Sequence, residues 1–273
     1  MFATAALIGL DFSGGVDAGR KIWLSIGRTD EGGRYVVERC LPAVELPGSA
    51  AERNAAIGAV RRLLRELTPD GATTIVGCDF PPSLPLMLIP GGDWRAFVED
   101  FPRRFPNEST FRAECTRLSG GREVKRRTDR ETKTPFCAYN LRMYRQTYFG
   151  IRDLLRPLVR EAGARVMPMQ PPQTRGLNLI EVCPASTLKR LGLYRPYKGK
   201  TDAHRRMRQS ILSVLRKGAR LSYSPAIARR IASDAEGDAL DSVIALLVTA
   251  RAAAGGLACP GGPEYHVEGY VFA

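Results

Sequence analysis

Residues 5–12 read AALIGLDF, an apolar run that ends in an aspartate and a phenylalanine. The turn-forming sequence Ser-Gly-Gly follows at residues 13–15, so the run predicts a short buried strand followed by a turn. A second run of this kind, TTIVGCDF, lies at residues 73–80, and two prolines that cannot continue a hydrogen-bonded ladder come after it. Both runs therefore predict strands with an acid, Asp11 or Asp79, near the carboxyl end.

The rest of the chain alternates strand and helix patterns. Further strands are expected at residues 21–28, 34–41, 164–168, 177–183 and 265–272. Ser49 is expected to be the N-cap of one helix. Apolar side chains at helical spacing predict three further helices, over residues 139–162, 202–216 and 236–254. This order predicts a single α/β domain over residues 1–273, with a mixed sheet flanked by helices. The irregular, basic region at about 90–138 is expected to be a helical and loop insertion.

Composition narrows the class of protein. Of 273 residues, 44% are hydrophobic and 25% are charged, as in ordinary globular proteins. No apolar run approaches the ~20 residues that span a bilayer, and the first residues lack a basic leader, so neither a membrane protein nor a secreted one is expected. The six cysteines form no C-x-x-C pair, and there are two histidines, which disfavours structural zinc. We expect a cytoplasmic protein with reduced thiols.

The positive charge is concentrated in one segment. The chain carries a net charge of +13, and residues 189–230 hold thirteen basic residues against one acid. Residues 103–133 hold ten basic residues against five acids. Basic segments of this kind bind phosphate backbones, so nucleic acid is the expected partner. A solvated helix face in an arginine-rich protein would give the same composition, and this alternative stays open.

Five acids occur where the pattern predicts buried elements: Asp11, Asp79, Glu181, Asp238 and Asp241. Asp238 and Asp241 are three residues apart, so a helix places them on one face. Buried carboxylates are costly unless they are paired or bind metal, and no base stands at a fixed offset to pair them. Oxygen ligands alone favour Mg²⁺ or Mn²⁺. Taken singly, each acid could instead organise a turn, start a helix or lie half-exposed on an edge strand.

Four stretches carry a resemblance to a known family: IGLDFSG at residues 8–14, GCDFP at 77–81, IEVCP at 180–184 and GDALD at 237–241. The sequence VEGYV at 267–271 resembles the C-terminal strand of the same family. In this order the motifs resemble the domain of unknown function 429 family, whose members are predicted nucleases with an RNase H-like fold. The resemblance covers nearly the whole chain, although the region 90–138 is longer and more basic than a minimal RNase H-like core.

The resemblance implies a metal-dependent nuclease that hydrolyses phosphodiester bonds at a two-metal carboxylate site. RNase H-like nucleases carry an acid on the first strand, another at the fourth strand and one or two on a late helix. By position, the implied metal ligands are Asp11, Asp79, Asp238 and Asp241, with Asp11 bridging the two cations. Glu181 belongs to the family's own motif and is a further candidate catalytic residue. The residues expected to contact the nucleic-acid backbone are Lys198, Lys200, Arg205 and Arg208.

Two other functions stay open from the sequence. An actin-like nucleotide-binding protein or kinase shares the RNase H topology, and the turn at residues 13–15 could bind phosphate after the first strand. A non-catalytic nucleic-acid-binding module could also retain this fold. The sequence does not choose between DNA and RNA as the substrate, and it does not give the oligomeric state.

Overall fold

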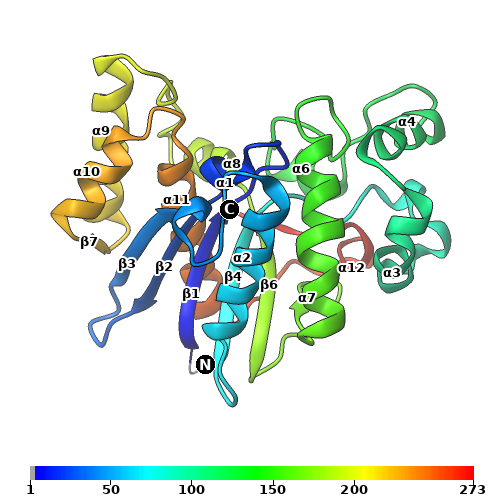
Figure 1. Ribbon diagram of the computed structural model, residues 1–273, viewed down its shortest axis with the longest axis horizontal. Helices are drawn as coiled ribbons and strands as arrows, with labels where there is room; N and C mark the ends of the chain where they lie inside the picture. The colour runs from blue at the N-terminus through cyan, green and yellow to red at the C-terminus, as the bar shows by residue number, and fades with distance from the viewer. Residues whose placement is uncertain (1–3) are drawn as a thin grey trace.

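The computed structural model describes residues 4–273, which form one mixed eight-stranded sheet flanked by helices (Figure 1). The strands are β1 (Thr4–Asp11), β2 (Trp23–Thr29), β3 (Tyr35–Pro42), β4 (Thr73–Asp79), β5 (Arg165–Val166), β6 (Gly176–Val182), β7 (Leu221–Tyr223) and β8 (Val271–Phe272). Their order across the sheet is β5-β6-β4-β1-β2-β3-β7, and β8 also pairs with β6. The α/β class and the mixed sheet predicted from the sequence are confirmed.

Strand direction changes at β1. β1, β2 and β3 form an antiparallel meander, whereas β4 and β6 run parallel to β1. The carboxyl ends of β1, β4 and β6 therefore meet at one edge of the sheet. The prediction of a strand at 265–272 is wrong in its first half, because residues 265–268 are helical. The helix ends at Gly269, whose φ is +87°, and β8 begins after it.

Helices cover both faces of the sheet (Figure 1). The longer ones are α2 (Arg53–Glu66), α3 (Trp94–Arg104), α4 (Glu108–Leu118), α9 (Asp202–Gly218), α10 (Pro225–Ser233) and α11 (Asp238–Ala254). The shorter ones are α1 (Ala18–Lys21), α5 (Arg127–Glu131), α6 (Tyr144–Phe149), α7 (Arg156–Glu161), α8 (Pro184–Arg190) and α12 (Tyr265–Glu268). Among residues 4–273, no helix is both long and apolar enough to cross a bilayer.

Two helix predictions need correction. The helix expected to begin at Ser49 begins instead at Arg53, because the Glu52 carboxylate accepts the free backbone N–H groups of Asn54 and Ala55 and caps the helix itself. The helix expected at 139–162 is shorter and changes pitch: α6 leads into a π-helical segment, Gly150–Leu155, and then into α7.

The basic insertion at 90–138 is more helical than its irregular sequence suggests. It contains α3, α4 and α5, and it lies at the opposite end of the sheet from α9 and α10 (Figure 1). Phe101, Phe105 and Phe111 of the insertion form a cluster of aromatic rings with Tyr148 of α6, with centroid separations of 5.0–5.8 Å. The insertion therefore extends the hydrophobic core that α2 forms on the same face of the sheet.

Helix α11 lies directly on the centre of the other face. Gly9 of β1 and Gly77 of β4 are opposite each other in the sheet register. A Cβ atom on Gly9 would overlap the backbone of Ser242 and Leu246 in α11, and one on Gly77 would overlap the Thr249 hydroxyl. The two glycines therefore allow the helix backbone to touch the strands, and this contact fixes the position of α11 over β1 and β4.

We predict that Gly9→Ala destabilises the protein by about 1–3 kcal/mol, because α11 must move away from β1 to admit the methyl group. Urea unfolding followed by circular dichroism measures this change. The control is Gly58→Ala in α2, where the added Cβ meets only the flexible end of Arg62 and helix propensity favours alanine. Equal stability of the Gly9→Ala protein and the wild type would contradict the proposed contact.

Candidate functional site

The carboxyl ends of β1 and β4 place two aspartates side by side. Asp11 and Asp79 are direct partners in the parallel register, two residues beyond the glycine pair. Side chains at partner positions leave the sheet on the same face, and side chains two residues apart along a strand do so too. Both carboxylates therefore lie on the α11 face of the sheet, at the edge where the strands end.

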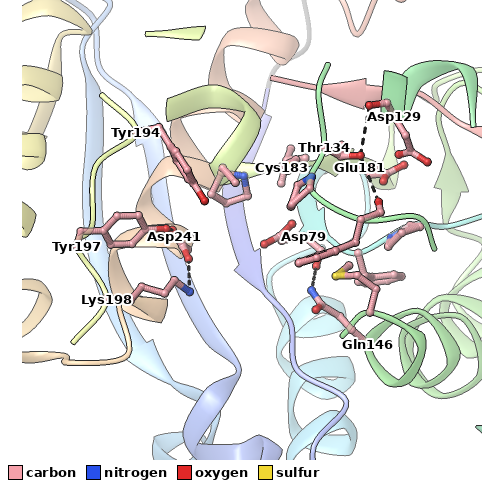
Figure 2. A pocket seen from close by; sticks show the side chains of 18 of the residues that line it. Asp79, Asp129, Thr134, Gln146, Glu181, Cys183, Tyr194, Tyr197, Lys198 and Asp241 are labelled. Atoms are coloured by element: carbon pink, nitrogen blue, oxygen red, sulfur yellow. Dashed lines mark hydrogen bonds and ion pairs between the residues drawn. The ribbon is translucent and has the colours of Figure 1, made fainter. Parts of the chain in front are cut away.

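The first turn of α11 brings two more acids to this edge. Asp238 and Asp241 start the helix after Gly237, whose φ of +81° turns the chain into it. Carboxylate oxygens of Asp11, Asp238 and Asp241 all lie within 4.8 Å of one another. Asp79 and Asp241 line the same pocket (Figure 2). The four aspartates, which we call the acid cluster, are thus brought together from three elements that are distant in the sequence.

Burial and mutual repulsion make the acid cluster hard to ionise without a cation. Burial, followed by the charges of Asp238 and Asp241, raises the pKa of Asp11 well above its ordinary range. Burial and the Asp241 charge raise the pKa of Asp79 to about 8. Burial raises the pKa of Asp238 to about 6, although Lys198 opposes the shift. An arrangement of oxygen ligands with this much unfavourable charge fits a divalent cation such as Mg²⁺ or Mn²⁺.

A lysine and a tyrosine from the loop before α9 contact the acid cluster. The Lys198 ammonium lies 2.8 Å from Asp241 Oδ2 and 3.3 Å from Asp238 Oδ1. The Tyr197 hydroxyl donates a 2.6 Å hydrogen bond to Asp241 Oδ1. Burial acts to lower the pKa of Lys198, but the carboxylates of Asp241, Asp11 and Asp238 outweigh it and raise the pKa. Lys198, expected to contact nucleic acid, therefore neutralises part of the acid cluster.

Glu181 is not brought into the acid cluster. It lies opposite Cys78, one position before Asp79, and its side chain therefore leaves the sheet on the other face. There it forms a bidentate ion pair with the buried Arg126, at 2.6 and 2.7 Å. Arg126 also pairs with Asp129 at 2.8 Å. The sequence shows no pairing base for Glu181 because Arg126 comes from the insertion, 55 residues earlier in the chain.

The four basic residues expected at a nucleic-acid interface have different environments. Lys198 contacts the acid cluster, while Lys200 and Arg205 are exposed. Arg208 is only 2% exposed, so it is not available to a phosphate. In place of the expected phosphate contact, its guanidinium donates to the carbonyls of Tyr197, Gly199 and Ala232 at 2.6–3.2 Å. Arg208 therefore fixes the loop that carries Tyr197 and Lys198.

Sequence reasoning missed three residues of this region: Tyr197, Arg126 and Gln146. Gln146 of α6 donates from its amide nitrogen to the carbonyl oxygen of Asp79 (Figure 2). Tyr197 lies in an irregular loop, and Gln146 lies in a helix whose polar face gave no signal. No periodicity or spacing connects these residues to the aspartates, so only the folded chain reveals them.

The family of the chain follows from a comparison with family models. The model described as "Protein of unknown function (DUF429)" matches residues 15–265. The chain belongs to this family. The match includes three of the four motifs that carried the resemblance, and Asp11 lies just before it. No curated protein matches this DUF429 protein, and no solved structure matches it.

The raised pKa values predict how the stability of the DUF429 protein depends on pH without metal. An acid with a raised pKa in the folded state stabilises the fold when protonated, and this contribution is lost as pH rises from about 4 to the folded pKa. In EDTA, wild-type stability should therefore fall as pH rises from 5 to 8, and Asp79→Asn should reduce this fall because burial raises the pKa of Asp79 to about 8.

Melting temperatures at pH 5, 6, 7 and 8 in EDTA measure this effect. The control is Asp70→Asn, since Asp70 is exposed in the loop before β4. The prediction fails if Asp79→Asn and wild type lose the same stability over this range. Added Mn²⁺ should raise the melting temperature of the wild type more than that of Asp79→Asn, because a bound cation stabilises the folded state by mass action.

Arg205 and Arg208 lie one turn apart on α9, but replacing each with alanine should have different effects. Arg205→Ala should leave stability unchanged, because the side chain is exposed; if Arg205 makes the phosphate contact expected from the sequence, the change should also lower the log–log salt slope of nucleic-acid binding by about 0.7–0.9. Arg208→Ala should destabilise the protein by about 1–3 kcal/mol, because buried carbonyls lose their donor. Urea unfolding and binding titrations against salt separate the two effects, and an unaltered stability of Arg208→Ala would contradict its internal role.

Proposed function

We propose that this DUF429 protein is a metal-dependent nuclease that hydrolyses phosphodiester bonds. The observation that carries the proposal is the convergence of Asp11, Asp238 and Asp241 within 4.8 Å, with Asp79 beside Asp11 in the sheet. Separate turn and capping roles would not require acids from two strands and a helix to meet. The family resemblance implies an RNase H-like nuclease, and nucleases of that fold carry metal on acids at the corresponding positions.

The arrangement of the sheet supports an RNase H-like fold for this chain. An antiparallel meander, β1 to β3, is followed by helix α2 and by β4, which pairs parallel to β1. This is the order of elements that the family resemblance implies, with the first acid on β1, the second on β4 and the last two on α11. The additional helices α3, α4 and α5 extend this core without separating the acids.

The acid cluster fits a divalent cation. Its donors are carboxylate oxygens, the ligands that Mg²⁺ and Mn²⁺ prefer, and burial leaves these charges poorly solvated. Lys198 supplies one positive charge to the cluster, which does not balance four carboxylates. We assign Asp11, Asp79, Asp238 and Asp241 as the metal ligands. Glu181 is left out because Arg126 already pairs with it.

Cations held there would activate a water molecule and stabilise the leaving oxygen of a phosphodiester. The chain itself positions the reacting groups. Asp11 is the sheet partner of Asp79 and has a carboxylate oxygen within 4.8 Å of those of Asp238 and Asp241, so it would be a ligand common to both parts of the cluster. Tyr197 fixes the orientation of Asp241 through its hydroxyl. The half-exposed Lys198 reaches the cluster from the solvent side, where it can bind a phosphate oxygen, and the exposed Lys200 and Arg205 extend this positive surface.

The actin-like alternative has less support from the geometry. A phosphate loop must leave its backbone open to the ligand, but Gly14 in the turn at residues 13–15 is buried against the backbone of Arg145 in α6. The Arg53 guanidinium also donates to the Gly14 carbonyl at 3.1 Å. The turn therefore serves to join β1 to the helix layer. A non-catalytic binding module is distinguished from a nuclease by measuring cleavage.

The test is a cleavage assay with single-stranded, duplex and branched DNA and RNA in Mg²⁺, Mn²⁺ or EDTA. We predict cleavage with Mg²⁺ or Mn²⁺, none in EDTA and none by Asp11→Asn. The control is Asp17→Asn, which alters an acid six residues later that pairs with Lys21 on the surface. Circular dichroism verifies that each variant is folded. Equal cleavage by the wild type in EDTA, or by Asp11→Asn, would refute the metal-dependent mechanism.

A further inference from the structure

A pocket of about 490 Å³ opens beside the acid cluster, over the carboxyl ends of β4 and β6. Its two sides come from distant parts of the chain. Residues 194–198 form one side, and residues 134–136 with α6 form the other (Figure 2). A volume of a few hundred cubic ångströms is typical of sites for small organic groups. The pocket is therefore too small for a duplex and large enough for one nucleotide.

The pocket lining combines two kinds of chemistry. Asp79, Asp241 and Lys198 belong to the acid cluster and its lysine, and Arg126, Asp129, Gln146 and Glu181 add further polar groups. Flat or rigid apolar side chains come from both sides of the pocket and from the strand ends: Phe80, Pro135, Phe136, Pro184, Tyr194 and Pro196. A ligand suited to this lining carries an anionic or metal-binding group joined to a flat ring with polar edges.

We propose that this pocket binds one unpaired nucleobase, while the phosphate attached to it lies at the acid cluster. This inference rests on the proposed function, and it specifies the substrate as single-stranded or locally unpaired nucleic acid. Bases in a duplex are stacked and paired inside the helix, with only their edges exposed in the grooves, so an intact duplex cannot place a whole base in this pocket. An unpaired base can leave the stack and enter it.

Tyr194 is the side chain best placed to stack on this base. It lies in the pocket wall and is 47% exposed, so its ring is accessible to a ligand. The Lys189 ammonium lies 5.2 Å from the centre of the Tyr194 ring, and Arg195 is the next residue in the wall. Aromatic rings next to basic side chains are the usual means of binding single strands, because the ring stacks on the nucleobase and the lysine or arginine binds the phosphates.

Polar groups in the pocket can recognise the edge of the base. Gln146 uses its amide nitrogen on the Asp79 carbonyl, and its amide oxygen has no hydrogen-bond partner among residues 4–273. Both oxygens of Glu181 and both oxygens of Asp129 accept from Arg126, which orients these carboxylates in the wall. Both oxygens of Glu181 and Oδ1 of Asp129 accept one such bond each and can accept a second, whereas Oδ2 of Asp129 already accepts from both the backbone N–H and Nε of Arg126. The wall therefore presents acceptors, which suit the amino and ring N–H groups of a base.

The test measures binding by fluorescence anisotropy in Ca²⁺, with gels to verify that the strands stay intact. The probes are labelled single-stranded 12-mers of DNA and RNA, the corresponding duplexes, and AMP or CMP as unlabelled competitors. We predict that single strands bind more tightly than duplexes and that Tyr194→Leu weakens single-strand binding by about ten-fold. Tyr194→Phe, which keeps the ring, should restore most of this binding. Tyr35→Leu on β3, outside the pocket, is the matched control and should bind as the wild type does.

The outcomes distinguish a nucleic-acid strand from a free nucleotide as the ligand. They also distinguish failure of the base pocket from failure of the proposed nuclease activity. Competition by AMP or CMP as strong as that by a strand supports the base pocket and assigns it to a free nucleotide. Tighter binding of duplex, or an unchanged affinity of Tyr194→Leu, would overturn the pocket. The Mn²⁺-dependent rise in melting temperature should be the same in Tyr194→Leu and wild type. Absence of cleavage with normal base binding would refute the nuclease but not the pocket.

Discussion

Direct contact between helix α11 and the Gly9–Gly77 pair is the constraint on which the site depends. Without Cβ atoms on these two residues, the helix backbone reaches the surface of β1 and β4. The same two strands end two residues later in Asp11 and Asp79. The first turn of α11 is therefore held over the strand ends, and its aspartates meet those of the sheet. A helix one side-chain diameter further away would leave the four acids too far apart to share a cation.

This proximity has an electrostatic cost that the protein meets in two different ways. On the α11 face, the acid cluster is compensated only in part by Lys198, so the pKa values of Asp11, Asp79 and Asp238 are raised, mainly by burial. On the other face, Arg126 donates to Glu181 and Asp129 and to the carbonyl of Glu268, with all of its N–H groups used. The first arrangement leaves a site where a cation could bind, whereas in the second a resident arginine holds both carboxylates, although burial still raises the pKa of Glu181 to about 7.

The insertion and the basic segment build the pocket between them. The insertion docks through its aromatic cluster and supplies Arg126 and the wall at 134–136. The basic segment supplies Tyr194 and Lys198, and Arg208 holds their loop by donating to backbone carbonyls. A buried arginine in this role explains why one of the basic residues of α9 faces inward although the helix as a whole is positively charged.

The sequence by itself determined the local elements and the candidate acids. Apolar runs that end in Asp11 and Asp79, and the i, i+3 pair Asp238 and Asp241, predicted strand ends and a helix start, because period and turn residues are local properties. Tertiary structure alone decided which acids meet. Glu181 had the same apolar context as Asp79, but a shift of one residue in register turned it to the opposite face, where Arg126 pairs with it. Likewise, their positive charge alone predicted the same phosphate-binding role for Lys198, Arg205 and Arg208. Packing placed the first at the acid cluster, the second in solvent and the third in the interior, because burial and pairing depend on segments that are distant in the chain.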